Sequence, residues 1–361
     1  MPNLLGQAIT INRKTVRNRI VMPPMVCFNW GDGHGFETVD RAEHYGRRAR
    51  GGVGLIVVEA TAINREGRLH VSQLGLWSDD QVDQFARVAT ACHDGNAVVL
   101  VQLVHAGSKA IGPKLYSASS SVDGDKPIQA MEPEHIERVK QDFVQASLRA
   151  QAAGLDGVEV HGAHGYLLNQ FTASRSNART DGYGGTLAGR SRLALETVQA
   201  VRAALGPDFI IGYRFGANDP SLAEDGWLLD RLVAAGVDWF NISTGIGVES
   251  IVPPADFPEH YITWLGCALH AQRRRAGQIG RPTACVYGLV QPAQAERLLA
   301  GGQTDLVAIG RGLLADPDWA NKALAGQAVN PCRHCKNGCA FRLDGRSCPV
   351  FGLSRAAATP A

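Results

Sequence analysis

The sequence predicts an α/β fold, a (β/α)8 TIM barrel with a short C-terminal Cys-rich extension. Eight short apolar segments, rich in Val and Ile, recur along the chain and are continuous rather than alternating. Strands buried on both faces have this pattern. Helical patterns lie between most of these segments, which indicates parallel strands joined by right-handed crossovers. Eight such units in roughly 300 residues fit a closed barrel.

The expected strands share length and composition, and they are Arg19–Pro24, Gly54–Glu59, Ala97–Leu103, Gly157–Val160, Ile210–Phe215, Trp239–Ser243, Thr283–Val286 and Leu306–Ile309. The clearest helical pattern runs from Glu134 to Gly154 and places Ile136, Val139 and Phe143 on one face. An open doubly wound sheet is the competing arrangement. Such a sheet usually carries a Gly-x-Gly-x-x-Gly turn after its first strand, and the sequence has none there.

Composition bounds the class of protein. Of 361 residues, 45% are hydrophobic and 19% are charged, with a net charge of +2, so no nucleic-acid partner is indicated. No apolar run reaches the roughly 18 residues that a membrane span needs, and no secretory signal is visible. Eight cysteines in such a chain favour a reducing, cytoplasmic location. We expect a barrel domain at 1–328 and a Cys-rich tail at 329–361; the oligomeric state stays open, a homo-oligomer included.

Catalytic groups of such barrels sit at the C-terminal ends of the strands. Polar residues, glycines and one alanine stand at those places here, and packing alone does not explain the polar residues. They are Glu59 and Ala60, Gln102, His161, Arg214, Ser243, Tyr287 and Gly288, and Gly310 and Arg311.

The segment after the fourth expected strand carries the strongest chemical signal. His161, His164 and Tyr166 fall within six residues. Two imidazoles can hold and polarise a substrate oxygen, and a phenol of pKa about 10 stays protonated and can act as a general acid. A single histidine is more often a buried structural residue, but two histidines and a tyrosine at this spacing favour catalysis.

This segment resembles the signature of the Old Yellow Enzyme family, the FMN-dependent ene-reductases. The resemblance covers the His-x-x-His-Gly-Tyr core and the later Asn177, Arg179, Asp181, Tyr183, Gly184 and Gly185. It implies bound FMN, NAD(P)H as electron donor and an activated alkene as small-molecule substrate. His161 and His164 would then donate to the substrate oxygen, and Tyr166 would protonate the α-carbon.

The resemblance also implies a set of flavin contacts. Pro23, Pro24, Met25, Val26 and Ala60 would contact the ring mostly by backbone, Gln102 would pair with its pyrimidine edge, Arg214 would lie near N1 and O2, and Gly288, Gly310 and Arg311 would bind the phosphate. A surface ion pair is the alternative for Arg214. Cys27 stands one residue from the position of a flavin-contacting cysteine in some relatives, so no redox role is assigned to it. A solvated side chain is the expectation for Lys109.

Two other functions stay open for the same fold. One is an oxidative N-demethylase or amine dehydrogenase. The other is a flavin-bearing subunit that passes electrons to a partner protein. The natural alkene and the preference between NADH and NADPH cannot be read from the sequence.

Four of the eight cysteines crowd into the tail. Cys332, Cys335, Cys339 and Cys348 are spaced x2, x3 and x8, so four thiols can converge on one centre. The arrangement resembles the [4Fe–4S] motif of the 2,4-dienoyl-CoA reductase and trimethylamine dehydrogenase branch, in which the last gap is longer. Tetrahedral zinc and reduced thiols without metal are the alternatives.

Overall fold

The computed structural model describes residues 4–217, 222–247, 251–277, 280–335, 338–342, 344–345 and 348–350. Eight parallel strands close into a barrel in the order β3-β4-β5-β9-β10-β11-β12-β13. Their bounds are β3 Ile20–Met22, β4 Leu55–Ala62, β5 Val98–Val104, β9 Gly157–Gly162, β10 Ile210–Ala217, β11 Trp239–Thr244, β12 Thr283–Val286 and β13 Leu306–Ala308. Each coincides with one expected strand, so the predicted (β/α)8 barrel is confirmed.

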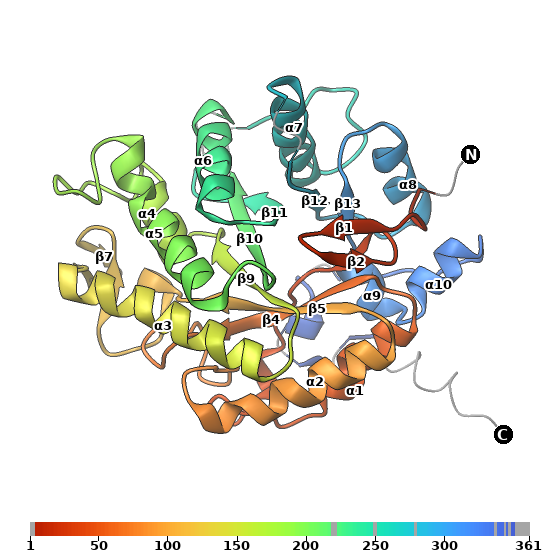
Figure 1. Cartoon of the computed structure of the whole chain (residues 1–361), viewed down its shortest axis with the longest axis horizontal. Helices are drawn as coiled ribbons and strands as arrows, with labels where there is room; N and C mark the ends of the chain where they lie inside the picture. The colour runs from red at the N-terminus through yellow and green to blue at the C-terminus, as the bar shows by residue number, and fades with distance from the viewer. Residues whose placement is uncertain are drawn as a thin grey trace.

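Helices surround the strands (Figure 1). They are α1 Arg41–Arg50, α2 Val82–Asp94, α3 Pro133–Ala152, α5 Leu187–Leu205, α6 Leu222–Ala235, α7 Tyr261–Arg275 and α8 Pro292–Ala300. Helix α3 matches the pattern expected between Glu134 and Gly154. It begins with Pro133, whose missing N–H costs nothing in the first turn, and it buries Ile136, Val139 and Phe143.

A β-hairpin that the sequence patterns did not predict lies across the N-terminal end of the barrel. It consists of β1 (Ile9–Ile11) and β2 (Lys14–Val16). Ile11 and Val16 are fully buried against residues of the strands. Lys14 Nζ lies 2.7 Å from Oδ1 of Asp156, which directly precedes β9. The hairpin therefore covers the end of the barrel opposite to the one where the polar strand ends gather.

Further elements decorate the loops at the C-terminal end. Strands β6 (Leu115–Ser117), β7 (Ser121–Asp123) and β8 (Lys126–Ala130) form a small sheet between β5 and α3. The remaining elements are short helices and turns: η1 Phe28–Trp30, η2 Asp79–Gln81, η3 Gly107–Lys109, α4 Leu167–Thr172, α9 Arg311–Ala315, α10 Trp319–Leu324 and η5 Ala340–Arg342. None of the described helices is long and apolar enough to cross a membrane.

Helix α10 ends at Leu324, and the domain boundary expected at 328/329 remains a prediction. Residues 351–361 of the predicted tail lie outside the described part of the chain.

Strand register brings the polar residues of the barrel together. Gln102 on β5 is the register partner of Glu159 on β9, His161 on β9 pairs with Arg214 on β10, and Arg214 pairs with Asn241 on β11. Side chains at matching positions of neighbouring parallel strands point to the same face. These residues therefore share one face of the barrel wall.

Candidate functional site

His161 lies at the end of β9 with 3% of its surface exposed. Its Nδ1 accepts a hydrogen bond from the backbone N–H of Ala163 at 3.2 Å, which places the ring proton on Nε2. Burial lowers the pKa of His161 well below its usual range, and the neighbouring His164 adds to this shift. His161 is therefore a neutral imidazole with one N–H to donate.

His164 has a left-handed backbone, with φ of 59°. Such strain in a non-glycine residue concentrates at functional sites. The backbone N–H of His164 donates to Thr244 O at 2.9 Å, and its carbonyl accepts from Lys109 Nζ at 2.8 Å. Its Nε2 lies 2.8 Å from Ser243 Oγ at the end of β11. Burial, then the charges of Arg214 and Lys109, lowers the pKa of His164 to about 3, so this imidazole is also neutral.

Tyr166 completes the group. Its ring centroid lies 4.9 Å from that of His161 and 6.3 Å from that of His164. Burial raises the pKa of Tyr166 above its usual value, so the phenol keeps its proton at neutral pH. Lys109, expected to be solvated, is exposed, but its ammonium lies 5.5 Å from the centroid of the Tyr166 ring. The structure thus brings the three signature side chains together.

Glu159 is a site residue that the sequence analysis missed. It is fully buried and accepts hydrogen bonds from Gln102 Nε2 at 2.6 Å and from Asn241 Nδ2 at 3.1 Å. Its contacts with Gln102 leave the other N–H and the carbonyl oxygen of that amide for a ligand. Burial raises the pKa of Glu159, and the nearby Arg214 opposes the shift. The clue in the sequence is a single carboxylate inside an apolar strand.

Arg214 is 5% exposed, which rules out the surface ion pair that the sequence left open. Its Nε and Nη1 have no hydrogen-bond partner among the described residues. An unmade hydrogen bond of a buried donor costs about 1–3 kcal/mol, and more for a charged group. Two such donors in one guanidinium therefore call for a ligand with acceptor atoms. The N1 and O2 atoms of a flavin have that character.

The residues predicted to bind the phosphate come from strand ends that lie side by side. A Cβ added to Gly310 after β13 would lie 3.2 Å from Met25 Sδ and 3.6 Å from Pro23 Cγ, so the first and last strand ends are in contact there. Gly288 after β12 has φ of 72°, which favours glycine.

A cavity of 550 Å³ opens beside these strand ends. Among the predicted site residues, Pro24, Met25, Val26, Tyr166 and Arg311 line it. The other predicted site residues do not line this cavity. Ala60 is buried, and its carbonyl accepts from Gln73 Nε2 at 2.8 Å.

Comparison with known proteins identifies the family to which the chain belongs. The profile of the NADH:flavin oxidoreductase / NADH oxidase family matches residues 5–330. The chain belongs to this family, the Old Yellow Enzyme family. It is therefore an FMN-dependent NAD(P)H oxidoreductase, as the sequence resemblance implied.

Two curated relatives of this Old Yellow Enzyme family member differ in length. An NADPH dehydrogenase of Halalkalibacterium halodurans is 34% identical over 90% of this chain and 94% of its own. An NADH oxidase of Thermoanaerobacter brockii is 34% identical over 94% of this chain. The match covers 53% of that NADH oxidase, so the chain spans about half the length of this relative.

Solved structures agree with this placement. A 2-naphthoyl-CoA reductase in complex with 2-naphthoyl-CoA superposes with a TM-score of 0.85 at 26% identity, covering 94% of this chain and 55% of that one. Morphinone reductase in complex with tetrahydroNAD superposes with a TM-score of 0.76 at 27% identity, covering 91% of this chain and 92% of that one.

Glu59 and Cys27 of this Old Yellow Enzyme family member have structural roles. Glu59 lies at an irregularity of β4 rather than at its end, because the strand continues to Ala62. Its carboxylate forms a buried ion pair with Arg41 Nε at 2.7 Å. Cys27 is fully buried, and its sulfur accepts the backbone N–H of Gly345 at 3.1 Å. Burial raises the pKa of Cys27 to about 12, which makes it a poor nucleophile.

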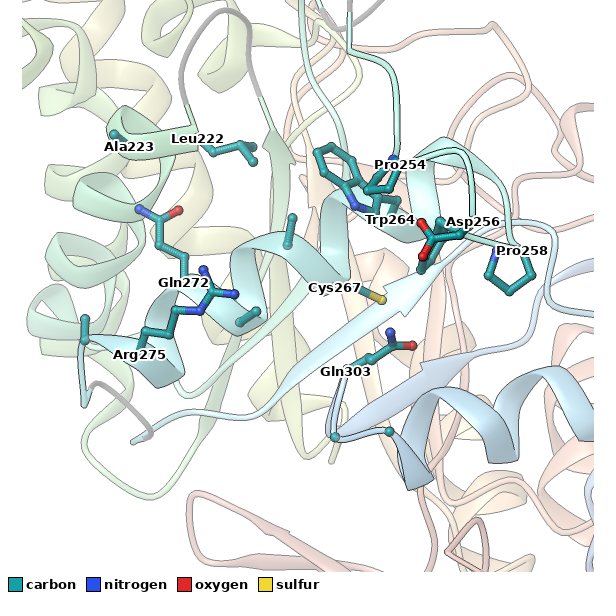
Figure 2. Close-up of a pocket in the computed structure, with 16 residues that line it drawn as sticks. Leu222, Ala223, Pro254, Asp256, Pro258, Trp264, Cys267, Gln272, Arg275 and Gln303 are labelled. Carbon is teal, nitrogen blue, oxygen red and sulfur yellow. The ribbon is translucent and has the colours of Figure 1, made fainter.

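A larger hollow, of 1020 Å³, lies on the outer wall of the barrel along α7 (Figure 2). Trp264, Cys267, Gln272 and Arg275 of α7 line it together with Gln303, which follows α8. None of the residues predicted for flavin or catalysis contributes to its wall. Volume alone therefore does not identify the reaction centre.

The four tail cysteines line one small cavity of 50 Å³ together with Arg311 and Leu314. Arg311, Leu314 and Cys339 also line the cavity beside Tyr166, so the two spaces share a wall. Among the described residues, however, no three His, Cys, Asp or Glu side chains are arranged to hold a metal ion. The predicted metal site stays a prediction.

Proposed function

We propose that this enzyme reduces activated C=C bonds, with NAD(P)H and the alkene using the same site in turn. The observation that carries the proposal is the convergence of His161, His164 and Tyr166 at the end of β9, next to the unpaired donors of Arg214. Two neutral N–H donors and a protonated phenol suit a carbonyl or nitro group conjugated to an alkene.

The chain offers a matching set of contacts for FMN. Gln102, with its orientation fixed by Glu159, would bind the pyrimidine edge. Arg214 would lie against N1 and O2, where a cation stabilises the negative charge of reduced flavin. Gly288, Gly310 and Arg311 would hold the phosphate, and Pro23, Pro24, Met25, Val26 and Ala60 would contact the ring.

The side chains divide the work of the reaction. Bound FMN would supply the redox chemistry, by which a hydride equivalent of NAD(P)H reaches the alkene. His161 Nε2–H and His164 would donate hydrogen bonds to the substrate oxygen and draw electron density from the alkene. Tyr166 would then deliver its proton to the α-carbon, and solvent would restore it. A general acid of this kind contributes about 10²–10⁴-fold to the rate.

Two measurements test the proposal. Purified protein should be yellow and release FMN on denaturation, and FAD or no bound flavin would contradict the cofactor assignment. Flavin reduced anaerobically with NADPH should be reoxidised by 2-cyclohexenone in a single turnover. If N-methyl amines reduced the oxidised flavin and enones did not reoxidise the reduced form, the oxidative N-demethylase or amine dehydrogenase would replace this proposal.

We propose further that Cys332, Cys335, Cys339 and Cys348 hold a [4Fe–4S] cluster. The support is that all four thiols line one cavity, which shares Cys339 with the active-site cavity. The described arrangement does not itself form a metal site, so the reaction above uses no step through the tail. Metal analysis decides among iron, zinc and no metal.

A cytoplasmic location is also a proposal. It rests on the cysteine content of the sequence, and all eight cysteines are free thiols in the structure.

A further inference from the structure

One charged residue on the wall of the active-site cavity has no role in the chemistry described above. The wall is otherwise mostly apolar, and its residues are Pro24, Met25, Val26, Phe28, Leu69, Tyr166, Arg311, Leu314, Cys339, Phe341 and Arg342. Arg311 is accounted for by the flavin phosphate. Arg342 remains, and none of the described residues that line this cavity with it is acidic.

The fold holds Arg342 at this place. It ends the short helix η5, in which the preceding Phe341 is 2% exposed. The Phe341 ring packs edge-on against Trp30 at 5.2 Å and stacks on His44 at 5.7 Å. A further backbone contact of the tail, from Gly345 to Cys27, fixes the chain after it. Arg342 is thus a surface residue on an anchored backbone.

The guanidinium of Arg342 is free to bind a ligand. No hydrogen bond or ion pair of its side chain is formed within the described part of the chain, in contrast to Arg41 and Arg179, which bind carboxylates. Its charge acts on the active site, because it opposes the rise in the pKa of Tyr166 that burial causes. Lys109 places a second cation 5.5 Å from the Tyr166 ring.

We infer that Arg342 forms an anion subsite at the mouth of the active-site cavity. It selects molecules that carry a carboxylate or phosphate away from the reacting atoms. The anionic group belongs either to the alkene or to the 2′-phosphate that distinguishes NADPH from NADH, because both molecules use the same cavity. This inference rests on the proposed function, and it makes Arg342 a specificity-determining residue rather than part of the proton or hydride transfer.

The test compares two alkenes that differ by one distant charge. Cinnamaldehyde and 4-carboxycinnamaldehyde present the same conjugated aldehyde, and only the second carries a carboxylate. The rate constant for reoxidation of reduced flavin, divided by the apparent Kd of the alkene, is measured by stopped flow for each. The value for 4-carboxycinnamaldehyde divided by the value for cinnamaldehyde reports selectivity for the anion.

Arg342→Gln should lower this ratio about five- to tenfold, the size expected for one charged contact at a partly solvated site. Arg342→Lys, which keeps the charge, should retain most of the selectivity, and high salt should reduce it in the parent protein. Arg274→Gln removes the same charge from the exposed end of α7 and should leave the ratio unchanged.

A second arm compares NADH with NADPH in the reductive half-reaction. If Arg342→Gln weakens the binding of NADPH more than that of NADH and leaves the alkene ratio unchanged, the bound anion is the cofactor phosphate. If Arg342→Gln changes neither the alkene ratio nor the ratio of NADPH to NADH affinity, or if Arg274→Gln has the same effect, the anion subsite is overturned. Failure of the proposed function has a different signature, because the parent enzyme would then reoxidise with neither aldehyde while the cofactor arm still decides the role of Arg342.

Discussion

The barrel mouth and the Cys-rich tail share a wall of the active-site cavity, yet they are built in different ways. At the mouth, strand register places the side chains that lie on the strands, and Glu159 links β5, β9 and β11 by accepting hydrogen bonds from Gln102 and Asn241. The tail, as far as it is described, has only the turn η5 and is held by Phe341 and by the contact of Gly345 with Cys27. The residues of the barrel mouth are therefore positioned by regular strand pairing, whereas those of the tail are positioned by a few contacts between distant parts of the chain.

The largest expected effect falls on the barrel side of this comparison. Tyr166→Phe should slow reoxidation of reduced flavin by 2-cyclohexenone about 10²–10⁴-fold, because the positioned acid is lost. Reduction of the flavin by NADPH needs no proton from this phenol and should change little. Stopped-flow measurement of both half-reactions checks this.

Tyr183→Phe provides the matched control. The Tyr183 hydroxyl donates to Glu196 at 2.9 Å, away from the site, and its loss should leave both rates close to parental. An unchanged alkene rate in Tyr166→Phe would show that another group supplies the proton.

The next largest effect concerns Arg214. Arg214→Met should weaken FMN binding by about 3 kcal/mol, roughly a hundredfold, because the flavin loses two buried hydrogen-bond donors and Glu159 loses its counter-charge. Fluorescence titration of the apo-protein with FMN measures this, and circular dichroism reports folding. Arg214→Lys, which keeps the charge, should bind FMN with intermediate affinity.

Arg231→Met on the exposed side of α6 is the control for a lost arginine. If Arg214→Met folds and binds FMN like this control, the donors of Arg214 do not face the flavin.

A smaller effect, on the free energy of unfolding, is expected when the pH is lowered. His105 and His164 have pKa values of about 4 and about 3 in the folded protein, chiefly because they are buried, and about 6.5 when unfolded. Below pH 6.5 the unfolded chain takes up protons that the folded chain does not. The stability of the fold is therefore undiminished by these histidines above pH 6.5, and it falls as the pH drops toward their pKa values in the folded protein.

Each such histidine costs about 1.4 kcal/mol per pH unit in that window. Urea unfolding at pH 7 and pH 5 measures the loss. His105→Gln should reduce the difference between the two pH values, and the exposed His34→Gln should not. Equal pH dependence in all three proteins would mean that His105 is not neutral in the fold.

The barrel and most of its candidate site residues could be predicted because each signal is local. Continuous apolar runs indicate buried strands, and His161, His164 and Tyr166 stand close together in the chain. Glu159 was missed because its partners Gln102 and Asn241 are 57 and 82 residues away, and only strand register brings them into contact.

The place of Arg342 on the wall of the active-site cavity was missed for a similar reason. Its position depends on the packing of Phe341 against Trp30 and His44, residues that lie near the start of the chain. The spacing of the tail cysteines predicts a common centre but not its distance from the active-site cavity. Local sequence patterns thus predict where the regular elements lie, whereas the position of the tail depends on contacts between distant residues.

The smallest effect on the barrel should come from the tail cysteines, and it sharpens the same comparison. If the four thiols hold a cluster, anaerobically purified protein should contain about four irons per chain, and the double substitution of Cys335 and Cys339 by Ser should remove them. Both residues are exposed in the structure, so the free energy of unfolding of the barrel should change by no more than about 0.5 kcal/mol. Iron analysis and urea unfolding followed by flavin fluorescence measure the two quantities. Zinc without iron would assign the centre to zinc, and absence of both metals from the parent protein would leave the tail as an access element that presents Arg342 without a metal.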